Sequence, residues 1–447
     1  MQINSNHFGS DFTWGCASAA FQIEGAVDID GKGPSIWDEF THQQGRIKTG
    51  QNADIACDHY HRYEEDLDLL AGMAFSNYRF SVAWSRVIPE GTGPVNEKGL
   101  DFYDRLIDAC LERSVIPWLT CYHWDLPLAL HRRGGWPERT ILSWFEEYVD
   151  LITRRYGDRV KNWMVLNEPV AFVGKGYGDG EFAPGEKSVK KFLKATHHVA
   201  LAQSAGGRII RQNVSDAHIG TTYSCSTIEP KSRSKLDKRA AQTFDALYNR
   251  LFIEPAVGLG YPTDELRPLR AIQKYMKPGD EDLLPFDFDF IGIQNYYRVV
   301  AKWTLWPPLL FAKEVPATKR NVETNTMGFE VYPEGMYDML KRFAGYPGVD
   351  KIIVTENGTC TPDVEQGGKV SDPTRIQFFE RYLEQVLRAR NEGVPVEGYF
   401  IWSLTDNFEW SDGYDPRFGL VYVDYATQKR TIKDSGYWWR NFLNFTP

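Results

Sequence analysis

The hydrophobic positions of this chain gather in short runs that recur along its whole length, each bounded by polar or turn residues. Apolar runs of about four to eight residues, rich in β-branched and aromatic side chains, are typical of strands buried on both faces of a parallel sheet. The pattern predicts eight strands, at residues 13–17, 77–81, 116–122, 163–167, 218–222, 290–294, 351–355 and 398–403.

Helix-like segments lie between these runs, and the clearest of them span residues 60–72, 98–113, 137–156, 189–213, 239–252 and 372–392. Strands that alternate with helices predict right-handed βαβ units and a parallel sheet. Eight strands spread over the whole chain predict an α/β fold, a closed (β/α)8 TIM barrel with elaborated βα loops at its C-terminal face.

No linker rich in proline, glycine or serine divides the chain, and no short internal repeat is evident. We therefore predict one catalytic barrel domain over residues 1–447. The longest stretch predicted to lack regular structure is 300–331, which includes Trp306-Pro307-Pro308. A long irregular segment in a barrel is expected on the catalytic rim, where such loops shape access of the substrate.

Composition and charge narrow the choice of partners. The chain has 447 residues, 42% of them hydrophobic and 25% charged, which is enough apolar material for a large core without metals or disulfides. Its formal net charge of -9, with no local run of lysine and arginine, would repel phosphate backbones and anionic membranes. We expect no nucleic acid partner and no membrane partner.

The six cysteines, at positions 16, 57, 110, 121, 225 and 360, are scattered, with no CxxC pair and no metal-like spacing with histidine. Free thiols in a reducing compartment fit this pattern best. The first residues lack a signal-peptide pattern, and no stretch reaches the ~20 apolar residues that span a bilayer. We expect a cytoplasmic protein without a metal, and the sequence leaves a monomer and a homo-oligomer both open.

Two glutamates follow predicted strands directly. Asn167-Glu168-Pro169 comes after the apolar run at 163–166, and Thr355-Glu356-Asn357-Gly358 comes after the run at 351–354. The carboxyl ends of barrel strands meet at one face, so both acids should point at one pocket. Two carboxyl groups at one site are what cleavage of a glycosidic bond requires, and this is the reaction that we predict.

Other polar and aromatic residues also lie where predicted strands end, and these are Gln22, Glu24, Arg79, His123, Asp125, Asn167, Asn295, Tyr297, Trp402, Glu409 and Trp410. Each has an ordinary structural explanation when taken alone: a buried histidine, an ion-pair partner or a packed ring. Their joint position at the catalytic end of a barrel favours a functional site.

These motifs make the sequence similar to the family 1 glycoside hydrolases, in their bacterial β-glucosidase branch. The resemblance covers nearly the whole chain and rests on FTWGCASAAFQIEGA (12–26), GPSIWDEF (33–40), YRFSVAWSRVIPEG (78–91), CYHWDLP (121–127), LNEP (166–169), NYY (295–297), TENG (355–358) and WSLTDNFEW (402–410). It implies a (β/α)8 barrel, net retention at the anomeric carbon, a small sugar substrate such as a β-glucoside, and no cofactor.

The same resemblance implies a role for each matching residue. Glu168 would be the acid/base and Glu356 the nucleophile, with Arg79, Asn295 and Tyr297 beside the nucleophile. The sugar would be held by Gln22, His123, Asn167, Trp402, Glu409, Trp410 and Phe418, and the leaving group would meet Trp124, Phe172, Tyr177, Phe182 and Phe329. Arg79 and Tyr297 are expected to keep Glu356 ionised, so that Glu168 holds its proton.

Three positions depart from the family pattern: Val165 replaces a threonine, Phe182 a histidine and Phe329 a tryptophan, so the leaving-group side looks more apolar than usual. Several activities stay open, namely a β-galactosidase or β-fucosidase, a transglycosylase, and a sugar-binding pseudoenzyme. A phospho-β-glucosidase is disfavoured because Glu409 would repel a phosphate group. A thioglucosidase is disfavoured because that branch has glutamine in place of Glu168.

Overall fold

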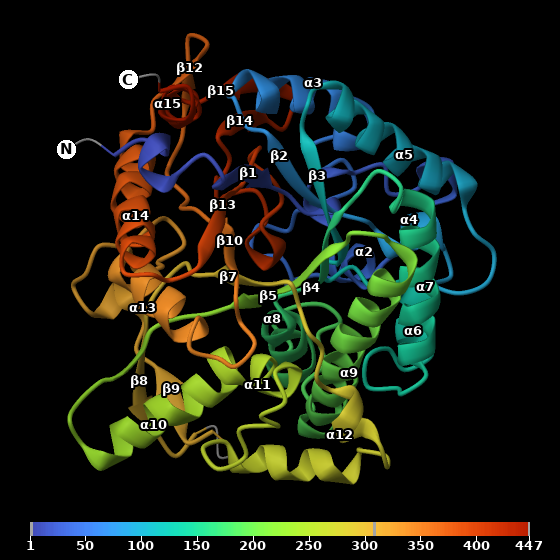
Figure 1. The fold of residues 1–447 in the computed structure, drawn as a ribbon, viewed down its shortest axis with the longest axis vertical. Coiled ribbons are helices and arrows are strands. Elements are labelled where there is room, and N and C mark those ends of the chain that lie inside the picture. Colours follow the sequence, from blue (N-terminus) through green and yellow to red (C-terminus); the bar gives the residue numbers. More distant parts are fainter. Residues whose placement is uncertain (1–2, 307–309, 446–447) are drawn as a thin grey trace.

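A computed structural model of the chain describes residues 3–306 and 310–445. Eight parallel strands close into a barrel in the order β1-β13-β10-β7-β5-β4-β3-β2 (Figure 1). They are β1 (Thr13–Ala17), β2 (Asn77–Ser81), β3 (Ile116–Tyr122), β4 (Asn162–Asn167), β5 (His218–Ser224), β7 (Phe290–Gln294), β10 (Ile352–Asn357) and β13 (Val396–Trp402). The prediction of a (β/α)8 TIM barrel is confirmed.

Helices surround the barrel, with α3, α5 and α7 along one side of Figure 1 and α13 and α14 along the other. They are α1 (Ala20–Ile23), α2 (Ile36–Thr41), α3 (His59–Gly72), α4 (Trp84–Val87), α5 (Glu97–Glu112), α6 (Leu128–Arg132), α7 (Ile141–Tyr156), α8 (Pro169–Val173), α9 (Val189–Asn213), α10 (Lys235–Asp245), α11 (Ile253–Ala256), α12 (Asp280–Leu283), α13 (Glu334–Phe343), α14 (Pro373–Asn391) and α15 (Asp434–Leu443). Over residues 3–306 and 310–445, no helix is long and apolar enough to cross a membrane.

The helices pack on the barrel through one apolar face each. In α5, for example, Tyr103, Ile107 and Cys110 are buried at spacings of four and three residues, which places them on the same side of a helix. In α9, the Ser188 hydroxyl accepts a hydrogen bond from the Lys191 backbone amide and so caps the first turn. Amphipathic helices with such caps are the parts of the chain that a sequence pattern predicts most readily.

Large side chains fill the inside of the barrel, so it is a packed core and not a channel. Trp118, Met164, Phe290 and Phe400 come from four different strands and form one buried cluster. Gly220 in β5 makes room for this packing, because a Cβ there would lie 2.3 Å from the ring of Phe290. The packed interior leaves the carboxyl end of the barrel as the place for a ligand.

Strand register brings residues distant in the sequence together at that end. Ala17 in β1 pairs with Arg79 in β2 on one side and with Trp402 in β13 on the other. Gln294 in β7 lies opposite both Ser224 in β5 and Glu356 in β10. The ends of these strands therefore form one ring of functional side chains.

Two expectations about local structure were wrong. The stretch 300–331 contains strand residues, because β8 (Val299–Trp303) and β9 (Ala312–Glu314) form a small sheet with β6 (Ile228–Pro230). The buried side chains of this sheet pack on α10, which stabilises its strands. Pro307 and Pro308 lie outside the described residues.

The helix expected at 239–252 begins earlier than predicted and passes from an α-helix to a π-helical turn within that range. The Ser234 hydroxyl accepts from the Asp237 amide, so α10 begins at Lys235. It ends at Asp245 and continues as a π-helical turn, η4 (Ala246–Arg250). The remaining short strands are β11 (Glu365–Gln366), β12 (Lys369–Val370), β14 (Val421–Asp424) and β15 (Lys429–Ile432).

Candidate active site

A cavity of about 760 Å³ opens at the carboxyl ends of the barrel strands, and both predicted glutamates line it. Glu356 is 4% exposed and Glu168 is 8% exposed, so each carboxyl group is largely withdrawn from bulk water. The structure thus brings the two acids into one pocket. Cavities of this size with a few convergent polar groups are typical of small-molecule sites.

Glu356 stands at the end of β10 and receives two hydrogen bonds. The guanidinium of Arg79 donates from Nη1 to Oε1 at 2.5 Å, and the hydroxyl of Tyr296 donates to Oε2 at 2.9 Å. Burial raises the pKa of Glu356 above its ordinary value, while the Arg79 charge and both hydrogen bonds oppose this rise. The arrangement stabilises the ionised carboxylate at the place where it is most strongly desolvated.

Glu168 directly follows β4 and immediately precedes α8, with a left-handed backbone at φ 44°. Such a conformation is uncommon for a residue other than glycine and often marks a functional position. Burial, and then the negative charge of Glu356, raise the pKa of Glu168 to about 8. Glu168 therefore holds a proton at neutral pH.

Asn167 joins the surrounding polar groups into one network. Its Oδ1 accepts from Arg79 Nη2 at 2.5 Å and from Gln294 Nε2 at 2.9 Å, which leaves Nδ2 to donate to His123 Nε2 at 3.0 Å. Burial and the Arg79 charge hold the pKa of His123 well below its usual value, so the ring is neutral. With Nε2 as the acceptor, the proton is on Nδ1, which has no partner within the described structure.

The opposite side of the pocket is built by β13 and the segment that follows it. Trp402 Nε1 donates to Glu409 Oε1 at 3.1 Å. The rings of Trp402 and Trp410 both stack on the ring of His123, with centroids 6.0 and 5.9 Å from its centroid. Burial raises the pKa of Glu409 to about 8, and hydrogen bonds from Trp402 and Gln22 oppose this rise. Phe418 also lines the cavity. Aromatic faces beside carboxyl and amide groups suit the apolar faces and the hydroxyls of a sugar.

A carboxylic acid and a carboxylate in one pocket, bordered by groups that bind hydroxyls, can protonate a leaving oxygen and attack an anomeric carbon. The model of the family described as Glycosyl hydrolase family 1 matches residues 4–446. The chain belongs to glycosyl hydrolase family 1. Membership makes it a glycoside hydrolase of the retaining β-glycosidase type.

Curated and solved members of glycosyl hydrolase family 1 resemble the chain over nearly its full length. The 1,4-beta-D-glucan glucohydrolase of Thermotoga neapolitana is 42% identical over 98% of both chains. The 6-phospho-beta-galactosidase of Clostridium acetobutylicum is 37% identical over 97% of this chain and 96% of its own. A structure of the beta-glucosidase from Thermotoga maritima in complex with glucoimidazole superposes with a TM-score of 0.91 at 41% identity, covering 97% of each chain.

The structure corrects the two residues expected beside the nucleophile in the NYY motif. Tyr296, and not Tyr297, donates to Glu356, while the ring of Tyr297 stacks on Phe329 at 4.6 Å. Asn295 turns away and donates from Nδ2 to the carbonyl oxygen of Cys225. Tyr297 still lines the cavity.

Two of the five residues expected on the leaving-group side are also misplaced. Trp124, Phe182 and Phe329 line the cavity. Phe172 instead packs on Trp136, with the two ring centroids 5.8 Å apart. Tyr177 is 1% exposed, and its hydroxyl lies against the backbone of Trp136. Both side chains therefore belong to the core behind the pocket.

Sequence analysis missed Gln294, Tyr296 and Ser224. Ser224 lines the cavity and its hydroxyl lowers the pKa of Glu168. Gln294 ends β7 and its Nε2 donates to Asn167, and Tyr296 comes two residues later and donates to Glu356. Tyr296 and Tyr297 both lie beyond the strand and both line the cavity, so strand alternation does not distinguish the two tyrosines.

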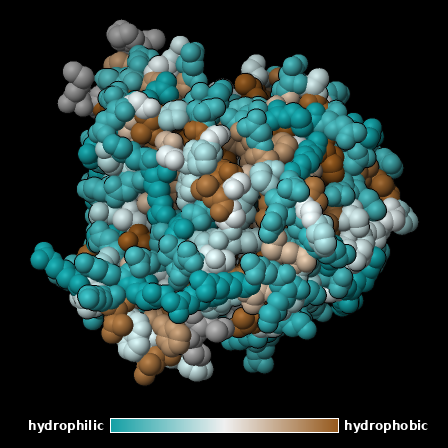
Figure 2. Space-filling model, turned by 60° about the horizontal axis from the view of Figure 1, so that its bottom comes forward, coloured by the Kyte–Doolittle hydropathy of each residue, from teal (hydrophilic) through white to brown (hydrophobic). Residues whose placement is uncertain are grey.

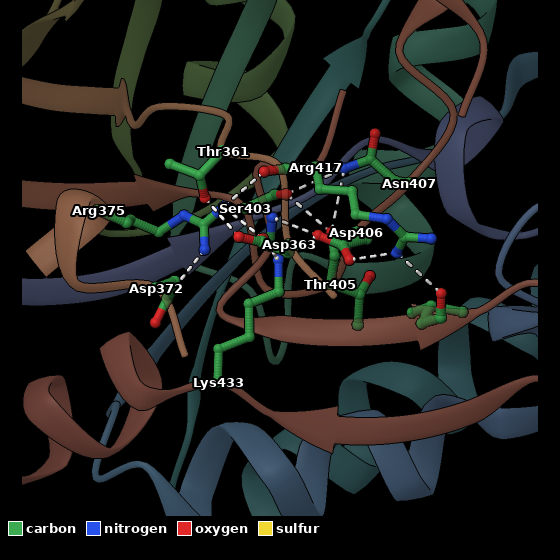
Figure 3. Close-up of polar contacts among 12 residues, drawn as sticks. Thr361, Asp363, Asp372, Arg375, Ser403, Thr405, Asp406, Asn407, Arg417 and Lys433 are labelled. Atoms are coloured by element: carbon green, nitrogen blue, oxygen red, sulfur yellow. Dashed lines mark hydrogen bonds and ion pairs between the residues drawn. The ribbon is translucent and has the colours of Figure 1, made fainter. Parts of the chain in front are cut away.

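The segment that carries Glu409 and Trp410 is held by buried charges (Figure 3). Lys433 Nζ donates to Asp406 at 2.6 Å and to Asp363 at 2.5 Å, and Arg417 also donates to Asp406 at 2.6 Å. Three cations and three carboxylates balance one another in this loop-anchoring network, which consists of Asp363, Asp372, Arg375, Asp406, Arg417 and Lys433. The next residue along, Asn407, accepts from Gln22 Nε2 at 2.9 Å and so links the network to the pocket.

Proposed function

We propose that this family 1 glycoside hydrolase is a β-glucosidase, which releases terminal non-reducing β-D-glucosyl residues from β-glucosides or cello-oligosaccharides. One observation carries the proposal: a protonated Glu168 shares the pocket with Glu356, whose charge is stabilised by Arg79 and Tyr296. The relatives described as a glucan glucohydrolase and as a beta-glucosidase support glucose as the sugar.

In the first step, a carboxylate oxygen of Glu356 forms a bond to the anomeric carbon while the glycosidic carbon–oxygen bond breaks. Glu168 gives its proton to the departing oxygen, so the leaving group departs as a neutral alcohol. The loss of the Glu356 charge then lets the pKa of Glu168 fall, because that charge was one cause of its rise.

In the second step, Glu168 takes a proton from water, and the hydroxide formed attacks the same carbon. The bond to Glu356 breaks, and the sugar leaves with its original anomeric configuration. Arg79 and Tyr296 receive the returning negative charge in a geometry that is already formed, which is the usual source of electrostatic stabilisation in enzymes.

Glucose is recognised mainly by the side of the pocket that is formed by β13 and the segment after it. We infer that Glu409 accepts hydrogen bonds from ring hydroxyls, that Gln22 and His123 supply further polar contacts, and that the face of Trp402 packs under the ring. Buried polar groups without partners discriminate strongly against sugars that lack the matching hydroxyl. His123 Nδ1 and Gln22 Oε1 are two such buried atoms.

Specificity for a sugar 6-phosphate, the activity named for the Clostridium relative, is less well supported. Phosphate would bring negative charge into a pocket that already holds the carboxylate of Glu356. Galactosides and fucosides differ from glucosides at one or two ring positions and remain alternative substrates, as does transfer of the sugar to an alcohol other than water. All six cysteines are buried and free, which suits a cytoplasmic location.

The decisive experiment measures release of nitrophenolate from p-nitrophenyl β-D-glucoside by the unaltered protein and by Glu356→Gly, with and without azide. We expect rapid release by the unaltered protein, loss of release in the variant, and rescue by azide with α-glucosyl azide as the product. β-Glucosyl azide as the rescue product, or full activity of the variant, would contradict the role of Glu356. Release of nitrophenolate from the galactoside but not from the glucoside would show that the same mechanism acts on a different sugar.

A further inference from the structure

The cavity does not end beside the catalytic glutamates but continues into an apolar chamber. Its walls come from the first turns of α9, from the π-helical turn η4, from η5 (Arg267–Lys274) and from the connection between β8 and β9. We call this part the aglycone chamber, and its principal apolar residues are Phe192, Leu193, Phe244, Leu247, Leu269 and Leu310. Trp124, Phe182 and Phe329, which the sequence places on the leaving-group side, line the same cavity as these residues.

Most charged residues of this region are paired or exposed, and the exception is Glu314, which lines the cavity, is half-buried and has its pKa raised by burial. Lys175 donates to Glu181 at 3.0 Å and lies over the ring of Phe182 at 4.5 Å, so its charge is already compensated. Asp179 and Lys313 are exposed. A second sugar in the chamber would have several hydroxyls facing leucine and phenylalanine side chains, which is costly for groups that lose hydrogen bonds to water.

The apolar surface also continues outward. Leu266, Pro268 and Leu310 line both this cavity and a neighbouring one that includes Trp303 and Phe311. Farther along the same connection, Leu305 is 71% exposed and Trp306 is 76% exposed. Figure 2 shows brown, hydrophobic side chains gathered at the lower edge of the face that carries this region. Apolar residues thus connect the two cavities, and further apolar side chains are exposed between β8 and β9.

We propose that the preferred leaving group is a hydrocarbon alcohol, an alkyl chain or fused apolar ring, rather than a second sugar. This inference rests on the proposed β-glucosidase function and specifies its substrate class. A hydrocarbon long enough to reach the chamber removes apolar surface from water on both sides. Binding through the leaving group then favours such glucosides over cellobiose.

The test compares methyl, butyl and octyl β-D-glucosides with cellobiose, all below the concentration at which octyl glucoside forms micelles, by measuring the glucose released. Alkyl leaving groups of similar acidity isolate the effect of apolar contact. We expect kcat/KM to rise by about two- to fourfold per buried methylene, and octyl to exceed methyl by at least about tenfold. Equal values along the series, or cellobiose better than octyl glucoside, would overturn the proposal.

A pair of variants locates the effect. Leu247→Asp introduces a charge into the chamber and is expected to lower the ratio of octyl to methyl kcat/KM by about tenfold. Leu236→Asp makes the same change on neighbouring α10, at a position 52% exposed, and should leave the ratio as in the unaltered protein. An unchanged ratio in Leu247→Asp, with an unchanged melting temperature, would argue against the chamber.

Binding of alkyl 1-thio-β-D-glucosides, which are poor substrates, separates this inference from the proposed function. Calorimetry on the unaltered protein is expected to give at least about tenfold tighter binding for the octyl than for the methyl thioglucoside. This holds even if no glucoside is hydrolysed, which would refute the β-glucosidase proposal alone. Equal affinities would refute the apolar leaving group while leaving hydrolysis intact.

Discussion

Tyr296 donates its hydroxyl to Oε2 of Glu356 at 2.9 Å, on the opposite carboxylate oxygen from the one that Arg79 contacts. Each oxygen of the proposed nucleophile thus has its own donor, and the plane of the carboxylate is fixed before a substrate enters. The rings of Tyr296 and Phe418 pack in a T-shaped arrangement with their centroids 6.2 Å apart, so a residue of the pocket wall also supports this orientation.

Tyr296→Phe should lower kcat by about 100-fold, because one donor to a charged group in a buried site contributes on the order of 2–3 kcal/mol. The hydrogen bond lowers the pKa of Glu356, so its loss should also move the acidic limb of the pH–rate profile to higher pH. Steady-state kinetics on p-nitrophenyl β-D-glucoside checks both effects. Tyr297→Phe keeps its ring on Phe329 and should cost far less, so a larger loss there would contradict the assignment.

The error over Tyr296 shows where sequence reasoning stops. The bounds of β1, β2, β3 and β7 follow from apolar runs between turn residues, and the structure reproduces them. Such apolar runs do not predict the direction of the side chains that follow the end of a strand. Resemblance to a family supplied the motif, but the conformation of the chain beyond β7 decides which tyrosine contacts Glu356.

Phe172 and Tyr177 illustrate a second limit. Both follow Glu168 closely, and an aromatic residue near a catalytic strand could equally line a pocket or pack behind it. Both side chains lie in the core because they contact Trp136, a residue of a different βα unit. The outcome depends on a long-range contact, which no local pattern predicts.

The pH dependence of kcat/KM should follow the protonation of Glu168. Its pKa is raised to about 8, so the general acid is in its active form below that pH and is lost above it. We expect the alkaline limb to fall near pH 8. Glu168→Ala should abolish that limb, and with an activated dinitrophenyl leaving group it should accept azide to give β-glucosyl azide. An alkaline limb unchanged in the variant would assign it to another group.

Glu409 should make the protein less stable as the pH rises. Burial raises its pKa in the folded state to about 8, above the ordinary value of 4.5, so the folded state binds the proton more tightly than the unfolded chain. The contribution of this proton is present below pH 4.5 and is lost between about pH 4.5 and 8. Glu409→Gln removes the ionisation and should raise the melting temperature at pH 8 relative to the unaltered protein.

Comparing the same two proteins at pH 5 supplies the control for that measurement, because nearly all folded molecules keep the Glu409 proton there and the unfolded chain has only begun to favour the ionised form. The stabilisation at pH 8 should be on the order of 1–3 kcal/mol and clearly smaller at pH 5. Sugar binding should weaken in the variant at both pH values. If Glu409→Gln raised the stability equally at both pH values, the gain would not come from the titration of Glu409.

Lys433→Met should destabilise the protein and disturb the sugar side of the pocket together. The ammonium group pairs with Asp363 and Asp406 inside the protein, and its removal leaves two buried carboxylates without that partner. Breaking a buried ion pair costs about 3–5 kcal/mol. Because Asp406 directly precedes Asn407, the partner of Gln22, KM for glucosides should rise more than kcat falls. Chemical denaturation and kinetics measure the two effects.

Lys429→Met is the matched control, since Lys429 is exposed at the start of β15, the strand that directly precedes Lys433. It should change the free energy of unfolding by less than about 0.5 kcal/mol and leave KM as it was. A Lys433 variant as stable as this control would show that the remaining arginines compensate the network.

Gly358→Ala should inactivate the enzyme by separating two strand ends. A Cβ on Gly358 would lie 1.9 Å from the carbonyl oxygen of Trp402, which is backbone and cannot turn aside. Relief of this clash must move the end of β10, with Glu356, away from the end of β13. Since misplacement by about 1 Å costs a catalytic group about 100-fold, kcat should fall by at least that factor. Gly72→Ala, where a Cβ meets open space at the end of α3, should retain full activity. Equal activity of the two variants would mean that the strand ends tolerate the shift and that contact of the two backbones does not set the position of the nucleophile.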